Sequence, residues 1–296
     1  MVYDCFVFFN ELDLLELRLN ILDAVVDRFV LVEATRTFQG KEKPLVFSDN
    51  RHRFEDFLGK IIHVVVTEYP DNPGKDPYVL ENHQRSMIKE GLRNCDPSDV
   101  ILISDVDEIP DPVRIIEAIS DRGIKIFRQR MFYYFLNCVN AGVAEDDMAG
   151  SEWTGTIMTR FGDIGDDVGK LRELSMMTPA VHHREFAGWF RWKYWLFRNS
   201  TAKRQPIRII DNGGWHFSFL GGAGRIIEKL EAFAHVEYNK EEFKDPRKIQ
   251  EAINSGRDIL GRGFRYRCIP LDATFPEYLL HNRERYKHLI RQEDKL

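Results

Sequence analysis

The sequence predicts an α/β fold in which a mostly parallel central sheet is covered by helices on both faces. Over the first 130 residues, short apolar runs that predict strands alternate with segments of helical periodicity. Such alternation is typical of parallel sheets built from strand–helix–strand units. The runs are almost continuously apolar, as strands buried on both faces are. The predicted strands are Cys5–Phe9, Phe29–Val32, Ile61–Val66, Val100–Ser104 and a weaker Ile124–Phe127.

Three helices are predicted between these strands. Asn10 is the expected N-cap of the first, because leucines recur after it at helical spacing. The other two begin at Asp76-Pro77 and Asp111-Pro112, where a capping carboxylate precedes a proline at the first helical position. These two helices are expected to run to about Arg93 and about Ser120. The leucines of the first helix are Leu12, Leu15, Leu19 and Leu22.

The pattern changes after residue 130. Residues 131–136 are strongly aromatic, and residues 141–185 are rich in glycine and aspartate and are expected to be irregular. Helices are predicted at Gly224–Ala234, from Asp245-Pro246 onward, and from Pro276 to about Gln292. Because no repeat or low-complexity linker interrupts the chain, we expect one domain that spans residues 1–296.

Bulk properties argue against several classes of protein. The net charge of −5 and the pI near 6.0 disfavour a nucleic-acid partner. No apolar run approaches the ~20 residues that span a bilayer, and the N-terminus lacks the basic region of a signal peptide. A soluble, cytoplasmic protein is therefore expected. The four cysteines are far apart and form no C-x-x-C motif, so we expect reduced, mostly buried thiols. They are Cys5, Cys95, Cys138 and Cys268.

An acidic cluster directly follows the fourth predicted strand. Asp105, Asp107 and Glu108 lie between that strand and Pro110. This position is the carboxyl end of a central strand, where open α/β sheets bind ligands. The two carboxylates of an Asp-x-Asp motif can converge on Mg²⁺ or Mn²⁺, which prefer oxygen ligands. The alternative is a solvated acidic turn before the next helix. For Glu108, orienting the turn and facing solvent remain equal alternatives.

Short blocks spread along the whole chain extend this interpretation. They are 4–15, 26–34, 37–40, 43–45, Gln84-Arg85, 104–110, 214–218, 276–280 and 282–286. In this order they resemble glycosyltransferase family 17. The segment 141–210 is the least similar part.

The resemblance implies an inverting enzyme of the GT-A (Rossmann-like) fold that uses UDP-GlcNAc and Mn²⁺ (or Mg²⁺) to form a β linkage on a glycan acceptor. Residues from 1 to about 130 would then form the nucleotide-sugar half, and about 131–296 the acceptor and catalytic half. A microbial or viral glycan is as suitable an acceptor as an N-glycan. Two alternatives stay open: a sugar-nucleotidyltransferase, although no Gly-rich loop follows the first strand, and a non-catalytic carbohydrate-binding protein.

The resemblance also suggests roles for single residues, each beside a structural alternative. Asn10 could border the uridine pocket or merely cap a helix. Glu33 could bind the nucleotide or pair with Arg36 or Lys43. Arg85 could bind base or phosphate, or belong to an exposed ion-pair stripe with Glu81 and Lys89. His216 could complete the metal shell or be a satisfied core residue. The expected metal ligands are Asp105, Asp107 and His216, and the expected nucleotide contacts are Asn10, Glu33, Arg85 and Asp105.

An inverting reaction needs a carboxylate that accepts the proton of the acceptor hydroxyl. Glu237 follows a Gly-rich loop and a helix, the order seen in GT-A enzymes, so it is the predicted base, with His235 positioning it. The competing acids are Asp163, Asp166 and Asp167. A group of tryptophans is expected either to stack on sugar or to build the core: Trp189, Trp192 and Trp195.

Overall fold

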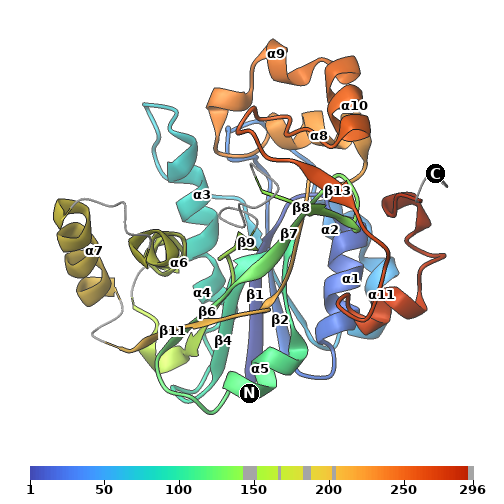
Figure 1. Ribbon diagram of the computed structural model, residues 1–296. Coiled ribbons are helices and arrows are strands. Elements are labelled where there is room, and N and C mark those ends of the chain that lie inside the picture. Colours follow the sequence, from blue (N-terminus) through green and yellow to red (C-terminus); the bar gives the residue numbers. More distant parts are fainter. Residues whose placement is uncertain (143–151, 166–167, 183–187, 202–204, 293–296) are drawn as a thin grey trace.

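Figure 1 shows a computed structural model that describes residues 1–142, 152–165, 168–182, 188–201 and 205–292. Within these residues, a seven-stranded sheet has the order β11-β6-β10-β4-β1-β2-β3. Four neighbouring pairs in it are parallel, and β10 runs antiparallel to both β4 and β6. The sheet is therefore mixed but mostly parallel, as predicted. Its strands are β1 Val2–Phe8, β2 Arg28–Ala34, β3 Ile61–Val66, β4 Val100–Asp105, β6 Ile124–Phe127, β10 Ile157–Arg160 and β11 Ile207–Ile210.

A second sheet meets the first where the acidic cluster turns. Its order is β13-β8-β7-β12-β5, with β9 added to β7. Since β4 ends at Asp105 and β5 begins at Glu108, one short turn connects the two sheets. In the antiparallel β5–β12 pair, His216 lies opposite Glu108. The strands are β5 Glu108–Pro110, β7 Gln129–Tyr133, β8 Cys138–Asn140, β9 Glu152–Trp153, β12 Gly214–Ser218 and β13 Tyr266–Cys268.

Helices cover both faces of the seven-stranded sheet, because alternate residues of its strands point to opposite sides. Phe6 of β1 packs in one core cluster with the leucines of α1 (Leu12–Leu22) and with α11 (Glu277–His281). Val7 packs in the other cluster with residues of α4, α6 and α7. Figure 1 shows the two groups on opposite sides of the strands. The second group comprises α3 Pro77–Ser86, α4 Ile88–Gly91, α6 Val168–His182 and α7 Gly188–Thr201.

A third cluster lies beyond the carboxyl edge of β4. There α8 (Gly222–Leu230) and α10 (Pro246–Ser255) pack with side chains of β7 and β13. In Figure 1, α8, α9 and α10 form the orange cap at the top of the molecule. The remaining elements are α2 Val46–Asp49, η1 Arg51–Phe57, α5 Pro112–Ala118, η2 Phe161–Asp163, η3 Val236–Tyr238, α9 Glu241–Lys244 and η4 Lys287–Leu289.

The predicted aspartate caps are confirmed. The carboxylates of Asp76, Asp111 and Asp245 each accept the backbone N–H two residues on, at 3.0, 2.9 and 2.9 Å. The prediction for Asn10 is wrong, because α1 begins after Glu11, whose carboxylate accepts the amides of Phe9 and Asn10.

Other elements also differ from the prediction. The helix expected to reach Arg93 is interrupted at Met87, between α3 and α4. The expected C-terminal helix ends at His281. The stretch 141–185, expected to be irregular, contains β10 and α6, whose apolar side chains are buried against the central sheet.

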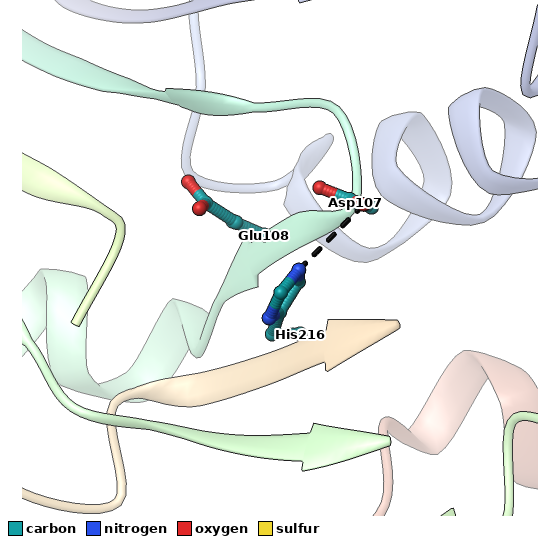
Figure 2. A group of neighbouring side chains, drawn as sticks. All are labelled: Asp107, Glu108 and His216. Atoms are coloured by element: carbon teal, nitrogen blue, oxygen red, sulfur yellow. Dashed lines mark ion pairs between the residues drawn. The ribbon is translucent and has the colours of Figure 1, made fainter. Parts of the chain in front are cut away.

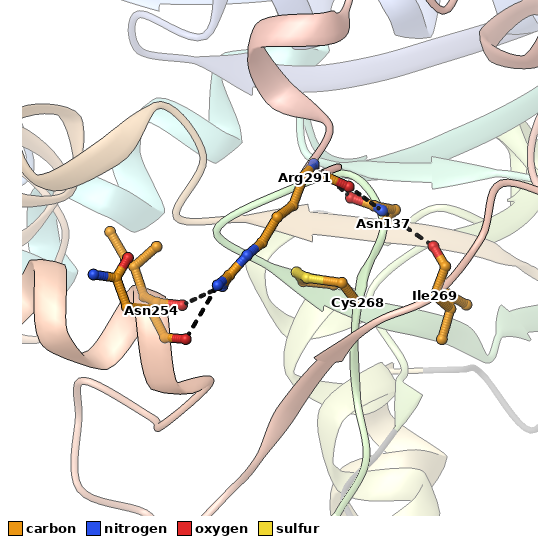
Figure 3. The surroundings of a disulfide bond; sticks show 7 residues. Asn137, Asn254, Cys268, Ile269 and Arg291 are labelled. Carbon is orange, nitrogen blue, oxygen red and sulfur yellow. Dashed lines mark hydrogen bonds between the residues drawn. A yellow bond between two sulfur atoms is a disulfide. The ribbon is translucent and has the colours of Figure 1, made fainter. Parts of the chain in front are cut away.

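The expectation of reduced thiols is wrong for two of the four cysteines. Cys138 and Cys268 form a disulfide, because the antiparallel β8–β13 register places them opposite each other across 130 residues of sequence. Cys5 and Cys95 are free, and burial raises the pKa of Cys5. Figure 3 shows how Asn137 and Arg291 tie the C-terminal segment beside the disulfide. Within the described residues, no helix is both long and apolar enough to span a bilayer.

Candidate active site at the turn between the two sheets

Asp105 ends β4, and arginines hold its carboxylate. Arg85 of α3 donates to both oxygens, at 2.6 and 3.1 Å, and also to Glu81 at 2.8 Å. A second arginine, Arg172 of α6, donates to Asp105 at 3.3 Å. Burial raises the pKa of Asp105, but the two guanidinium groups outweigh it and hold that pKa at about 2. The structure thus brings Asp105 and Arg85 together. Arg85 also forms the expected i,i+4 pair with Glu81, but its side chain is buried, so the alternative of an exposed ion-pair stripe is wrong.

Asp107 lies at the centre of the turn and is 5% exposed. Its Oδ2 accepts from Lys229 Nζ at 2.7 Å and from Ser218 Oγ at 3.3 Å. His216 Nε2 lies 3.6 Å from the same oxygen. Although burial raises the pKa of Asp107, its interactions with Lys229 and His216 lower it far below its ordinary value. Asp107 is therefore an ionised carboxylate at neutral pH.

Glu108 does not face solvent, because its side chain is buried and hydrogen-bonded. One carboxylate oxygen accepts the backbone N–H of Asp105 at 2.9 Å. The other accepts from the indole of Trp153 and from Arg172. A Cβ at position 155 would collide with this carboxylate, so Gly155 leaves the necessary room. Of the two alternatives for Glu108, orienting the turn is the one that the geometry supports.

Arg18 organises the turn, and the sequence analysis missed it. This fully buried side chain donates to Asp4 at 2.6 and 2.7 Å and to Ser104 Oγ at 2.6 Å. It also donates to three carbonyls of the turn, those of Asp105, Val106 and Glu108. Two signals could have revealed it. Arg18 interrupts the leucine stripe of α1, and Asp4 interrupts an apolar strand. Buried charges of this kind are costly unless they are paired.

His216 reaches from β12 toward Asp107 (Figure 2). Its ring packs on Trp153, with ring centroids 4.8 Å apart. Among the described residues, no hydrogen-bond partner is found for its buried Nδ1. One ligand atom each from Asp107, Glu108 and His216 lies within 4.8 Å of the other two. Carboxylate oxygen and imidazole nitrogen suit a borderline divalent cation such as Mn²⁺. The residues present therefore fit such a cation, with Asp107 and His216 together and the carboxylate of Asp105 turned to Arg85.

The structure does not bring Glu33 into this site. Its carboxylate is fully buried and accepts the amide of Phe47 at 2.8 Å, and His63 Nε2 lies 3.1 Å away. Glu33 therefore stabilises the start of α2. Asn10 donates to Glu228 at 3.0 Å and lines an open cavity of about 130 Å³ beside Lys229.

Glu237 lies on η3 and His235 directly precedes that helix, and both side chains are at the surface. His235 Nδ1 lies 2.8 Å from the carboxylate of Glu237 and 3.2 Å from the hydroxyl of Tyr78 on α3. A hydrogen bond from its own backbone amide, aided by His235, lowers the pKa of Glu237. The contacts described for this pair connect it to α3 and not to Asp107.

The other predicted residues are scattered. Asp163 accepts a hydrogen bond from Gln205 at 2.9 Å. Asp166, Asp167 and the side chain of Trp189 lie outside the described parts of the chain. Trp192 and Trp195 on α7 are 60% and 56% exposed, so these two do not belong to the core.

Comparison with known proteins gives a family match and similar relatives, each covering part of the chain. Residues 1–135 match the model of glycosyltransferase family 17. The β-1,4-mannosyl-glycoprotein 4-β-N-acetylglucosaminyltransferases of Homo sapiens and Rattus norvegicus are each 34% identical over 107 residues, which cover 34% of this chain. The match spans 20% of the length of these relatives.

Solved structures give weaker matches. The inositol-1-phosphate CTP transferase of T. maritima is 11% identical, with a TM-score of 0.33 over 71% of this chain and 84% of that one. A putative glucose-1-phosphate thymidylyltransferase of Bacillus anthracis is 8% identical, with a TM-score of 0.36 over 73% and 88%.

Proposed function

We propose that this chain, whose residues 1–135 match the model of glycosyltransferase family 17, is an inverting, metal-dependent glycosyltransferase. In this proposal GlcNAc passes from UDP-GlcNAc to a glycan acceptor with a β linkage. The observation that carries the proposal is the turn from Asp105 to Glu108, which lies inside the matched segment at the carboxyl end of β4. The similar proteins are N-acetylglucosaminyltransferases, which supports the choice of GlcNAc as the donor sugar.

The proposed cation is Mn²⁺ or Mg²⁺, held by Asp107 and His216. When bound, it neutralises the negative charge that builds on the diphosphate as UDP leaves. Asp105, kept ionised and oriented by Arg85, accepts hydrogen bonds from the ribose hydroxyls. Asn10 borders the nucleotide. Glu33 is too deeply buried for a direct contact, so its proposed part is to hold α2 in place.

In the proposed GT-A arrangement, the chain forms a single domain. Residues from 1 to about 130 bind the nucleotide sugar and about 131–296 bind the acceptor. The mostly parallel sheet, with the acidic turn at its carboxyl edge, supports the first assignment. The second sheet supports the second assignment, because its strand β12, which follows residue 131 in the sequence, places His216 at the same turn.

Glu237 is the proposed base for the acceptor hydroxyl, with His235 as a positioning residue. The lowered pKa of Glu237 keeps its carboxylate ionised at neutral pH, the protonation state that a base requires. The hydrogen bond from His235 fixes the orientation of that carboxylate.

The decisive experiment follows UDP release from a panel of UDP-sugars with Mn²⁺, with and without glycan acceptors. We expect release from UDP-GlcNAc that Asp107→Asn abolishes while circular dichroism stays unchanged. If no UDP-sugar is turned over, the proposal is wrong. Pyrophosphate formation from a nucleoside triphosphate and a sugar 1-phosphate would indicate a nucleotidyltransferase instead. Glycan binding without any turnover would indicate a carbohydrate-binding protein.

A further inference from the structure

Lys229 lies in direct contact with the carboxylate at the centre of the candidate site. Its ammonium is 2.7 Å from Asp107 Oδ2 and 3.0 Å from Ser218 Oγ, and it lies over the ring of Phe219. The backbone beneath it is fixed, because Ile226 and Leu230 of the same helix are fully buried in the third core cluster. Lys229 is therefore placed at Asp107 by the packing of α8.

The partners of Asp105 and Asp107 differ in how easily they can leave. Arg85 is 6% exposed and is held by two carboxylates, those of Asp105 and Glu81. Lys229 is 25% exposed, and its ammonium is a compact charge on a flexible four-carbon stem. Asp107 thus has a cationic partner that can be exchanged, whereas Asp105 has one that is fixed.

An adjoining cavity gives the ammonium a place to move to. The open cavity beside Lys229 is also lined by Asn10, Glu11 and Gly221. Glu11 offers a second carboxylate in the lining of this cavity, while the helix that follows it packs on the central sheet. A rotation of the lysine stem would therefore carry the charge from one anionic partner toward another without moving the backbone.

We propose that Lys229 and the divalent cation compete for Asp107, so that Lys229 leaves this carboxylate for the cavity when the cation binds. The inference rests on the cation site of the proposed function. An ammonium and a metal ion disfavour each other on one carboxylate oxygen, because the two positive charges repel each other at such distances. Once released, the ammonium of Lys229 faces the cavity and can bind the diphosphate of the donor. Cation and donor then favour each other's binding, as reciprocal linkage requires.

The test measures Mn²⁺ binding directly, from the electron paramagnetic resonance signal of free Mn²⁺, with and without UDP. Lys229→Met keeps the apolar stem and removes the charge. Without UDP we expect this variant to bind Mn²⁺ about tenfold or more tightly than the unchanged protein, the scale of one lost charge-assisted hydrogen bond to Asp107. The tightening of Mn²⁺ binding by UDP should be smaller in the variant, because the released ammonium is missing.

Lys41→Met is the matched control. It removes the same charge from a lysine that pairs at 3.2 Å with Glu231, which is two residues from Lys229 in the sequence. No contact is described between Lys41 and Asp107. We expect its Mn²⁺ affinity to stay within about twofold of the unchanged protein, because exposed pairs contribute little. Lys229→Gln serves as the second variant if circular dichroism shows that the methionine variant misfolds.

Unchanged or weaker Mn²⁺ binding by the Lys229 variants would overturn the competition. This outcome is separate from a failure of the proposed reaction. If the unchanged protein transfers no sugar but the Lys229 variants still bind Mn²⁺ more tightly, the competition is supported and the proposed glycosyltransferase activity is wrong.

Discussion

Arg18 offers the sharpest test of how the candidate site is built. We expect Arg18→Met to lower the free energy of unfolding by about 3–5 kcal/mol, the cost of leaving one member of a buried ion pair without its partner. The structure supports this energy value because Asp4 is fully buried and both of its carboxylate oxygens accept hydrogen bonds from Arg18. The three turn carbonyls lose their donor as well. Methionine retains much of the apolar stem, so the loss reflects polar contacts more than packing.

The assay is urea denaturation followed by tryptophan fluorescence, at one pH and one ionic strength. Asp4→Leu combined with Arg18→Met is the matched control. Replacing a whole buried ion pair by apolar residues is often nearly neutral. The double variant should therefore be clearly more stable than Arg18→Met alone. A loss below about 1 kcal/mol in the single variant would refute the reasoning, since that is the scale of a single ordinary hydrogen bond. So would a double variant that is no more stable than the single one.

Three further predictions concern protons, catalysis and thiols. The pKa of Asp105 in the fold is about 2, below its ordinary value, so its contribution to stability is complete at neutral pH and is lost as the pH falls from about 4 to 2. Urea midpoints measured at several pH values should show this loss, and the pH dependence should be smaller in Asp105→Asn. If Glu237 is the base, Glu237→Gln should lower turnover by roughly two to four orders of magnitude with little change in UDP binding. A near-normal rate would show that another acidic residue is the base. Thiol titration of the denatured, unreduced protein should find the two free cysteines, and all four should react after reduction; four reactive thiols before reduction would contradict the Cys138–Cys268 disulfide.

The central strands could be predicted because their signal is local. Each of the five predicted runs lies within or overlaps a strand of the large sheet, and the Asp-Pro helix starts depend on adjacent residues alone. The insertion of β10 between β4 and β6 could not be predicted in this way. It depends on backbone pairing between segments about 30 to 60 residues apart, and a mostly polar, Gly-rich surrounding sequence hides the short apolar run. The disulfide was missed for the same reason, because only the β8–β13 register brings its cysteines together.

The acidic turn was recognised from its sequence, but the different roles of Asp105 and Asp107 within it were not. Asp105 and Asp107 look alike in the sequence, being two residues apart in one motif. Their partners come from α3 and α6 in one case and from α8 in the other, and only the fold decides which cation meets which carboxylate.

A charged residue within an apolar segment is easier to recognise in a sequence than the residue that pairs with it. Arg18 among leucines indicates a buried pair, because an unpaired charge in a core would be too costly to keep. Nothing comparable marks Lys229, since a lysine in the last turn of a helix is ordinary on any surface. Yet the exchangeable ammonium at Asp107 and the fixed guanidinium at Asp105 give these two similar carboxylates different chemistry. In the proposed site, one is therefore available to a divalent cation, and the other is held to face the nucleotide.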